Sequence, residues 1–312
     1  MPPSPALTCW FLTGPTAAGK TGLAVELARR IDAEIVSMDS MALYRGMDIG
    51  TAKPTADECQ AVPHHLIDVI EPHEDYSLAR YAEDAGTCIE QVKSRGREVL
   101  FVGGTPLYLK ALLRGIFQGP EADWEFRRRM EAYGQRHGPE SLHRRLAEVD
   151  PVSADRLHPN DTKRLIRALE VHEKTGRPIS ELQRQFDTGR KAEECRVFML
   201  DWPREPLYAR IDRRVEQMFV DGLVDEVQGL LNGPRPLSRT AGQAVGYREV
   251  IEHLAGARGL PETIELVQRH TRRLAKRQMT WFRSLSECRR IPIAHPVDTT
   301  GLAAEIAAAG RR

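Results

Sequence analysis

Residues 14–21 read Gly14-Pro15-Thr16-Ala17-Ala18-Gly19-Lys20-Thr21, and this stretch decides the fold. It matches the pattern G-x-x-x-x-G-K-[ST] of a phosphate-binding loop. An apolar run at 9–13 precedes it, and a helix is predicted from Lys20 to about Arg30. The loop glycines let backbone amides turn towards phosphate oxygens, and the helix N-terminus adds unpaired amides and a positive dipole end. We therefore expect all eight residues to form a diphosphate site, with Lys20 as a cation and the Thr21 hydroxyl as a Mg²⁺ ligand. The motif does not fix the reaction.

Strands and helices are predicted to alternate on both sides of this loop. Apolar runs predict further strands at 34–38, 65–70, 98–102 and 195–200. Segments of helical pattern are predicted at 77–95, 206–231, 241–256 and 261–284. Such alternation indicates a mainly parallel sheet with right-handed crossovers. The expected fold class is α/β, with a P-loop NTPase-like parallel sheet as its core.

The middle of the chain differs from this core. Residues 122–188 are strongly charged and helical in pattern, which predicts an inserted all-helical domain between core segments 1–121 and 189–312. One helix is capped by Asn160 or Asp161, has Leu165 and Leu169 on one face, and ends at 175–178. Lys163 and Arg164 occupy its first turn, where the helix dipole disfavours cations. They indicate either an anionic partner or tolerated surface charges beside Asp161.

The bulk composition excludes some classes of protein. The 312 residues carry 45 basic and 44 acidic side chains, so a uniformly basic nucleic-acid binder is excluded, whereas a local basic surface is not. The five cysteines show neither zinc-site spacing nor a disulfide framework. Apolar runs are too short to span a membrane, and the first five residues lack a basic side chain. We expect a cytoplasmic protein without a signal peptide.

Polar residues follow three of the predicted strands. They are the phosphate loop, the segment Asp39–Tyr44 and the segment Gly103–Tyr108. Ligands of open parallel sheets bind beyond the carboxyl ends of the strands, so Asp39 and Thr105 should lie on the same rim as Lys20. Asp39 could hold Mg²⁺, act as a base or cap a helix near Ser40, and Thr105 could be a turn residue. The acidic partner of the metal is either Asp39 or Asp68.

Six ordered blocks of the chain resemble the tRNA dimethylallyltransferase family and span most of its length. They include the phosphate loop, which many families share, and the far more specific block from Asp39 to Pro54. The six blocks are 14–21, Asp39-Ser-Met-Ala-Leu-Tyr-Arg-Gly-Met-Asp-Ile-Gly-Thr-Ala-Lys-Pro54, Val102-Gly-Gly-Thr-Pro-Leu-Tyr108, His158-Pro-Asn-Asp-Thr-Lys-Arg-Leu-Ile-Arg-Ala-Leu-Glu170, Val245-Gly-Tyr-Arg248 and Leu274-Ala-Lys-Arg-Gln-Met-Thr-Trp-Phe-Arg283.

The resemblance implies transfer of a dimethylallyl group from dimethylallyl diphosphate to the exocyclic amine of the adenine 3′-adjacent to the tRNA anticodon. Pyrophosphate leaves, and Mg²⁺ is the expected cofactor. By this resemblance Asp39 is the base, Thr105 helps to position the amine, and Lys20 stabilises the leaving group. Arg210 and Arg213 resemble the diphosphate-contacting arginines of the family, although the sequence leaves open which of them reaches.

The resemblance also implies contacts with the anticodon stem-loop and a monomeric, bacterial-type enzyme. Gln243 stands where some members have arginine, and the Cys/His zinc finger of eukaryotic members is missing from the sequence. A basic helix face at Arg269, Arg273 and Lys276 is a further candidate phosphate track. The expected tRNA contacts are Asp39, Ser40, Met41, Ala42, Thr105, Arg127, Lys163, Arg164, Leu165, Ile166, Arg167, Gln243, Ala244, Val245, Gly246, Tyr247 and Arg248.

Three other functions share the phosphate loop. A small-molecule or nucleotide kinase would place ATP there, but it explains neither the charged insertion nor the block from Asp39 to Pro54. An adenylate prenyltransferase, which modifies a free nucleotide, needs no RNA-binding surface. A P-loop switch or RNA-binding ATPase usually has an acidic residue after a later strand, whereas Val102 is followed by glycine.

Overall fold

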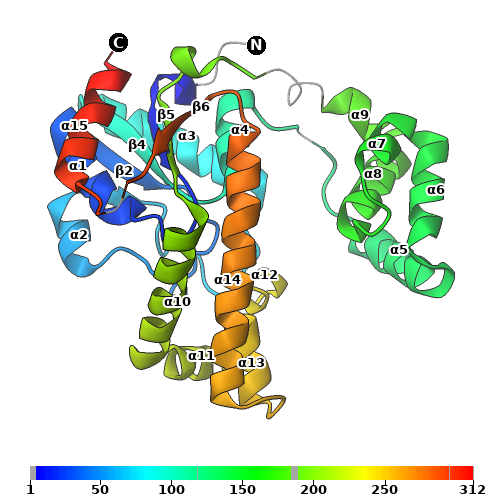
Figure 1. Ribbon diagram of the computed structural model, residues 1–312. Coiled ribbons are helices and arrows are strands. Elements are labelled where there is room, and N and C mark those ends of the chain that lie inside the picture. The colour runs from blue at the N-terminus through cyan, green and yellow to red at the C-terminus, as the bar shows by residue number, and fades with distance from the viewer. Residues whose placement is uncertain (1–4, 118, 184–188, 295, 312) are drawn as a thin grey trace. The chain divides into compact units, whose positions relative to one another are not determined.

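The computed structural model describes residues 5–117, 119–183, 189–294 and 296–311. Within these ranges, six strands form one parallel sheet in the order β3-β2-β4-β1-β5-β6 (Figure 1). The predicted α/β class with a parallel sheet core is confirmed. The strands are β1 Trp10–Thr13, β2 Ala33–Ser37, β3 His64–His65, β4 Glu98–Gly103, β5 Val197–Asp201 and β6 Cys288–Pro292.

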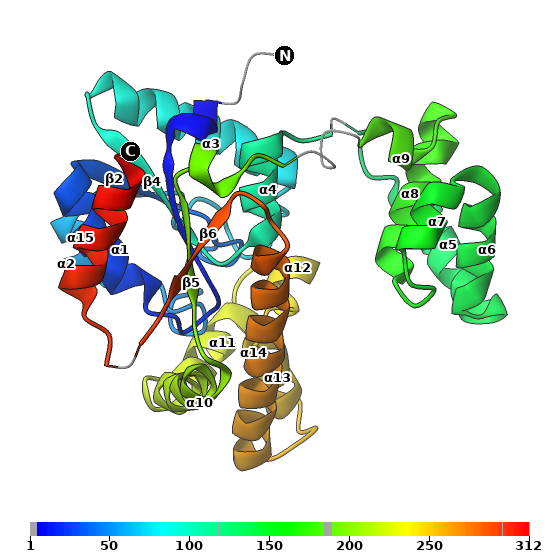
Figure 2. The same ribbon diagram turned by 45° about the horizontal axis from the view of Figure 1, so that its top comes forward.

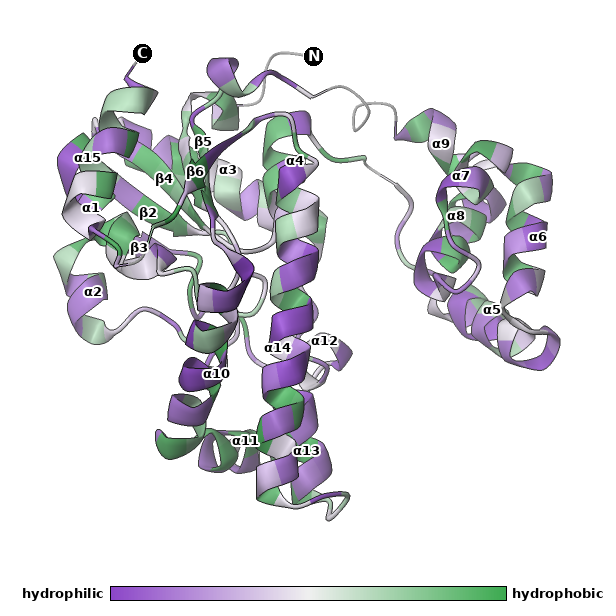
Figure 3. Cartoon of the chain, in the orientation of Figure 1, coloured by the Kyte–Doolittle hydropathy of each residue, from purple (hydrophilic) through white to green (hydrophobic). Residues whose placement is uncertain are grey.

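Helices cover both faces of this sheet. Side chains alternate along β1, so Trp10 and Leu12 pack with α1 and α15 on one face, while Phe11 packs with α3 and α4 on the other. Strands β2, β4 and β5 are correspondingly hydrophobic along most of their length, whereas β6 carries two arginines (Figure 3). The helices of this part are α1 Lys20–Ile31, α2 Ala56–Ala61, α3 Leu78–Ser94, α4 Pro106–Arg114, α10 Arg204–Val220, α11 Leu223–Leu231, α12 Arg239–Gly242, α13 Tyr247–Leu254, α14 Leu260–Arg283 and α15 Thr299–Gly310.

Helices from the C-terminal half of the chain pack against one another beside the sheet core. Helix α10 packs along α14, and α11 packs against α13, as Figures 1 and 2 show from two directions. Helix α10 also contributes Leu207, Ile211 and Val215 to the hydrophobic core that contains the buried side of α1. Because these residues recur every four positions, one side of α10 is buried and another is left for polar side chains.

The chain divides into two compact units. One comprises Met1–Leu113 and Gly189–Arg312, and the other comprises Arg114–Thr188, so the predicted insertion at 122–188 begins a few residues later than the observed unit. The second unit has its own core, in which Leu142, Leu146 and Leu165 are completely buried. Its helices are α5 Trp124–His137, α6 Pro139–Val149, α7 Pro151–Arg156, α8 Thr162–Thr175 and α9 Ile179–Leu182.

Several predicted elements differ from those observed. The strand expected at 65–70 ends at His65, because Leu66 and Asp68 adopt the left-handed conformation, with φ of 57° and 55°. The long helix expected at 206–231 is two helices, separated at Gly222, whose φ of 100° ends α10. Strand β6 and helix α15 were not predicted.

Three further expectations concern a signal peptide, a membrane-spanning helix and the cap of the helix that begins near residue 161. Residues 1–4, on which the expectation about a signal peptide partly rests, lie outside the described residues. Among the helices that the structure describes, none is long and apolar enough to cross a bilayer. At the helix predicted from Asn160 or Asp161, the Asp161 carboxylate is the cap and accepts the Arg164 amide at 3.4 Å.

Candidate active site

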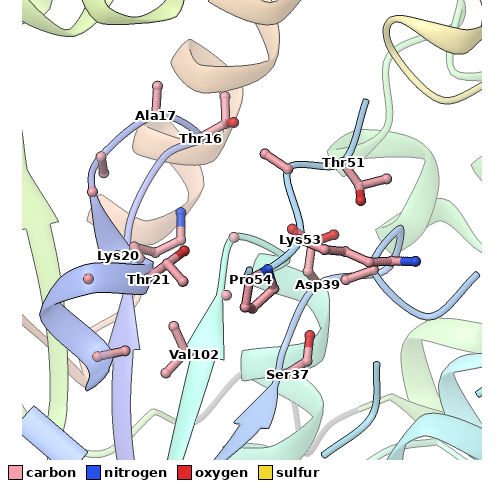
Figure 4. A pocket seen from close by; sticks show the side chains of 18 of the residues that line it. Thr16, Ala17, Lys20, Thr21, Ser37, Asp39, Thr51, Lys53, Pro54 and Val102 are labelled. Carbon is pink, nitrogen blue, oxygen red and sulfur yellow. The ribbon is translucent and has the colours of Figure 1, made fainter. Parts of the chain in front are cut away.

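A pocket of about 590 Å³ lies over the carboxyl ends of β1, β2 and β4. Figure 4 shows Lys20 and Thr21 on one side of it, with Asp39, Thr51 and Lys53 on the other. The predicted convergence of the phosphate loop and Asp39 on one rim is therefore observed. Its lining includes 16–22, Ala24, Ile35, Ser37, Asp39, Ala42, 51–54, Glu58, His64, Ile67, 102–104, Arg210, Arg213, Arg214, Gln217 and Gln278.

The phosphate loop encloses the Lys20 side chain. The Lys20 ammonium donates hydrogen bonds to the carbonyls of Gly14, at 3.1 Å, and Pro15, at 2.7 Å. The loop is fixed from outside by the Trp202 indole N–H, which donates to the Ala18 carbonyl at 3.1 Å. Burial lowers the pKa of Lys20 to about 8, the Asp39 carboxylate opposes this shift, and the Arg214 guanidinium adds to it. An anionic ligand would compensate these confined cations.

We expect the Lys20→Met variant without ligand to be more stable than the unmodified protein at pH 7. The folded pKa of Lys20, about 8, lies below its ordinary value of 10.5, so the charged side chain destabilises the folded state at low pH. This cost is fully present below about pH 8 and disappears as the pH rises towards 10.5. Denaturant unfolding at pH 7 and pH 10 should show a stability difference that shrinks with pH. A difference that is constant with pH would contradict it.

Helix α10 brings three arginines to the pocket. Arg210 donates from Nε to the Ala17 carbonyl at 3.0 Å, and its guanidinium lies 4.8 Å from the centre of the Trp202 ring. Arg214 donates from Nη1 to the Thr16 hydroxyl at 3.3 Å. Burial lowers the pKa of Arg214, although the Asp39 carboxylate raises it. Arg213 also lines the pocket, so the sequence prediction included two of the three arginines and missed Arg214.

Asp39 and Thr105 lie in the turns that follow β2 and β4. The Asp39 carboxylate accepts the Met41 amide at 2.9 Å, and residues 40–43 form bends and turns rather than the helix that a capping role requires. The Thr105 hydroxyl accepts the Ser40 amide at 3.1 Å, while the Thr105 amide donates to the Met38 carbonyl at 3.2 Å. These bonds hold the two segments together, and Asp39 lines the pocket beside them.

Gln278 of α14 joins the phosphate loop to the turn after β4. Its Oε1 accepts the Thr16 amide at 2.9 Å, and its Nε2 donates to the Gly104 carbonyl at 2.7 Å. Sequence reasoning placed Gln278 on a helix but gave it no role, because its contacts involve residues far away in the chain. The available signal was a polar residue between Leu274 and Trp281 on an otherwise apolar side of the helix.

The residues of the pocket fit a magnesium ion held partly by phosphate oxygens. Thr21 and Asp39 supply a hydroxyl and a carboxylate in the lining. Mg²⁺ is commonly held by one or two protein oxygens together with substrate phosphates. The alternative partner, Asp68, pairs with the Lys53 ammonium and does not line the pocket. In the described ranges, no group of three or more histidine, cysteine or acidic side chains could form an all-protein metal site.

In the insertion, the predicted RNA contacts fall into two groups. Lys163 and Arg164 are exposed, and Arg164 also pairs with Asp161 at 3.4 Å. Leu165 and Ile166 are 0% and 3% exposed, so their side chains are buried away from any RNA, and a contact at these positions stays a prediction that only their backbone could meet. They lie on the apolar face of α8 and pack into the core of the insertion.

Arg127 and Arg167 both serve a buried carboxylate. Glu170 is completely buried, and it accepts the Asp123 amide at 2.7 Å and two hydrogen bonds from Arg127 at 2.8 Å. Arg167 pairs with the same carboxylate and also donates to the Pro120 carbonyl at 3.0 Å. Hydrogen bonds from these partners lower the pKa of Glu170 against the effect of burial. Both arginines therefore have a structural role within the insertion, whether or not RNA reaches them.

The variant Arg127→Ala is expected to destabilise the insertion by about 1–3 kcal/mol, because it removes two charge-assisted bonds from a buried carboxylate. Thermal unfolding should show the loss in the absence of RNA. Arg128→Ala, which removes an exposed arginine from the next position of the same helix, is the matched control. Equal stability of the two variants would contradict the structural role.

The segment 243–248 is only partly accessible. Gln243 is exposed, whereas Ala244 and Tyr247 are buried, so the Tyr247 side chain is not available to RNA in this structure. Arg248 pairs with the buried Glu249 at 2.6 Å and approaches His270 at 3.0 Å. In the turn after β2, Ser40 and Met41 are partly exposed, and Ala42 is buried in the wall of the pocket.

Comparison with known proteins identifies the family. Residues 42–285 match the family described as IPP transferase. The chain is 52% identical to the tRNA dimethylallyltransferase of Rhodopirellula baltica over 287 residues, which cover 89% of this chain and 86% of the relative. It is 48% identical to the enzyme of the same name from Geobacter metallireducens, over 89% of this chain and 90% of the relative.

Solved structures agree with these relatives. The tRNA isopentenylpyrophosphate transferase of Bacillus halodurans superposes with a TM-score of 0.69 at 38% identity, over 97% of this chain and 96% of the other. A eukaryotic dimethylallyltransferase studied crystallographically while acting on tRNA gives a TM-score of 0.72 at 26% identity, over 91% and 73% of the two chains. The chain therefore belongs to the tRNA dimethylallyltransferase family, as its six sequence blocks indicated.

Proposed function

We propose that this protein transfers a dimethylallyl group from dimethylallyl diphosphate to the exocyclic amine of the adenine 3′-adjacent to the tRNA anticodon. The observation that carries the proposal is a single pocket that combines a phosphate loop, confined cations and a carboxylate. One end suits a diphosphate, since Lys20 and Arg214 lie there. Ile35, Ala42 and Val102 line other parts of the same pocket and can accommodate an apolar five-carbon group.

The reaction joins the adenine nitrogen to the allylic carbon of the donor. As this bond forms, the bond from carbon to the diphosphate oxygen breaks, and its electron pair leaves with pyrophosphate. Negative charge therefore grows on the leaving group, where Lys20 and the arginines of α10 stabilise the transition state more than the bound donor. Hydrogen bonds to Thr16 and Ala17 hold Arg214 and Arg210 beside the phosphate loop.

Asp39 provides the base. The adenine amine is a weak nucleophile because its lone pair is delocalised into the ring, and loss of its proton to a carboxylate assists attack. Asp39 lines the pocket opposite Lys20, and the Met41 amide orients its carboxylate. We assign the orientation of the amine to Thr105, whose hydroxyl accepts the amide of Ser40 next to Asp39, although Thr105 itself is outside the lining residues.

Mg²⁺ is the proposed cofactor, and the Thr21 hydroxyl would hold it together with phosphate oxygens of the donor, which leaves the Asp39 carboxylate available as the base. When bound with the donor, the ion would neutralise charge on the diphosphate. With the ion present, Lys20 would neutralise a smaller share of the diphosphate charge. The phosphate loop would still orient the donor through its amides.

The acceptor is the anticodon stem-loop of tRNA, bound by a monomeric enzyme in the cytoplasm. An unpaired loop adenine can leave its stack at a lower cost than a base in a duplex. Exposed cations of the insertion, including Lys163 and Arg164, and the partly exposed Arg248 are candidates to hold the RNA backbone.

The test is transfer of radiolabel from dimethylallyl diphosphate to unmodified tRNA in the presence of Mg²⁺, with an EDTA reaction to test the metal. A tRNA with guanine at the target position is the matched substrate control. Label in the adenine-containing tRNA alone would support the proposal. Consumption of ATP without transfer of label to RNA would contradict it and favour a kinase or ATPase.

A further inference from the structure

Glu226 of α11 binds a turn of the chain that forms one wall of the pocket. Its carboxylate accepts the backbone amides of Asp48, Ile49 and Gly50 at 2.9, 2.7 and 3.2 Å. Hydrogen bonds to a charged acceptor are stronger than those between neutral groups. Three such bonds from successive residues fix the position of this turn relative to α11.

Tyr247 completes the same attachment from the start of α13. Its hydroxyl donates to Glu226 Oε1 at 2.6 Å, and its side chain is completely buried. Burial and the adjacent Glu226 carboxylate raise the pKa of Tyr247, so the hydroxyl remains a donor at physiological pH. A Cβ atom on Gly50 would lie 2.5 Å from a ring carbon of Tyr247, so the ring packs directly against the backbone of the turn.

The turn transmits this attachment to the pocket because its own bonds make it stiff. The Thr51 hydroxyl donates to the Met47 carbonyl at 2.6 Å. The Lys53 ammonium donates to the Tyr44 carbonyl and the Asp48 carboxylate, both at 2.6 Å. Residues 51–54 line the pocket, whereas Glu226 and Tyr247 do not. A shift at the Glu226 attachment would therefore move the pocket wall as a unit.

We propose that Glu226 and Tyr247 are positioning residues for the donor, which set the wall formed by residues 51–54 without touching the substrate. The inference rests on the proposed function, because it takes dimethylallyl diphosphate as the ligand of this pocket. It also assigns Tyr247 a role that its burial permits, in place of direct contact with RNA.

The experiment measures binding of dimethylallyl diphosphate without RNA by calorimetry, together with kcat and both KM values in the transfer assay. The variants are Tyr247→Phe, Glu226→Gln and the double variant. Asp225→Asn removes an exposed carboxylate from the adjacent position of α11, and Tyr208→Phe removes a hydroxyl from a tyrosine outside the pocket lining. These two variants are the matched controls.

Tyr247→Phe is expected to weaken donor binding and raise the donor KM about tenfold, the effect of losing one hydrogen bond to a charged group. The tRNA KM should change less than about twofold, because the ring packing is retained. The double variant should lose less than the product of the two single effects, since both changes break the same contact.

Two results would overturn the inference. One is donor binding in Tyr247→Phe and Glu226→Gln equal to that of the controls. The other is a fall in kcat and a rise in both KM values by similar factors, together with a lower Tm. That result would indicate general damage to the fold. If the unmodified protein binds the donor but transfers nothing to tRNA, the proposed function fails, and the calorimetric comparison still decides the role of Glu226 and Tyr247.

Discussion

Replacing Asp39 by asparagine is expected to lower kcat for prenyl transfer at least about a hundredfold, the usual contribution of a general base. Asparagine keeps an oxygen that can accept the Met41 amide, so the turn after β2 should be preserved. Because the substitution removes the proton acceptor and leaves Lys20 in place, the donor KM should change much less than kcat. Single-turnover transfer of radiolabel to tRNA measures this loss directly.

A magnesium titration separates the two roles available to Asp39. If the carboxylate acts mainly as a metal ligand, excess Mg²⁺ should restore much of the activity of Asp39→Asn, and the assignment as base would be wrong. Asp68→Asn is the comparison variant, since Asp68 is the alternative metal partner and is not itself among the lining residues, although its partner Lys53 is. Added Mg²⁺ should change the activity of Asp68→Asn far less than that of Asp39→Asn.

Replacing Arg214 by alanine is expected to lower kcat by about 10²–10³, the range observed when one donor to a developing negative charge is removed. Arg214 lies beside the Thr16 hydroxyl, and the field of the Asp39 carboxylate reaches its guanidinium. Inhibition by the product pyrophosphate should weaken in the same variant, because the cation also faces the released group. Steady-state kinetics with added pyrophosphate tests both effects.

The other arginines of α10 provide the comparison. Arg213→Ala should have a smaller effect than Arg214→Ala, since Arg213 lines the pocket without a hydrogen bond to the loop among those observed in the described ranges. Arg210→Ala should disturb loop position through the lost bond to Ala17. A larger loss of kcat in Arg213→Ala than in Arg214→Ala would assign the diphosphate contact to Arg213 instead.

Sequence alone predicted the parts of the site that depend on local pattern. The phosphate loop and Asp39 each follow an apolar strand and line the pocket together, because parallel strands bring their carboxyl ends together, whereas Thr105 follows β4 without being among the lining residues. Arg214 was missed although helix geometry could have indicated it. At 3.6 residues per turn, Arg210 and Arg214 share a face, whereas Arg213 points about 100° away from Arg214.

Other features depended on contacts that the sequence does not display. Leu165 and Ile166 belong to a recognisable family block, yet the same helix needs an apolar face for the core of the insertion, and burial decides between these roles. Gln278 and Glu226 act through backbone groups of distant segments, which carry no side-chain signal. Strand β6 has two arginines in its five residues and therefore lacks the apolar run of a buried strand.

The order of strands in the sheet has a consequence for synthesis of the chain. Strand β1, which leads into the phosphate loop, pairs with β4 on one side and with β5 on the other. Strand β5 follows the whole insertion in the sequence, so a growing chain exposes one edge of β1 while the insertion is being made. Unpaired edges of this kind promote association between incomplete chains. The core of the helical insertion is local in sequence, so the insertion can fold on the ribosome before the sheet is complete. The second edge of β1 is paired only after β5 has emerged.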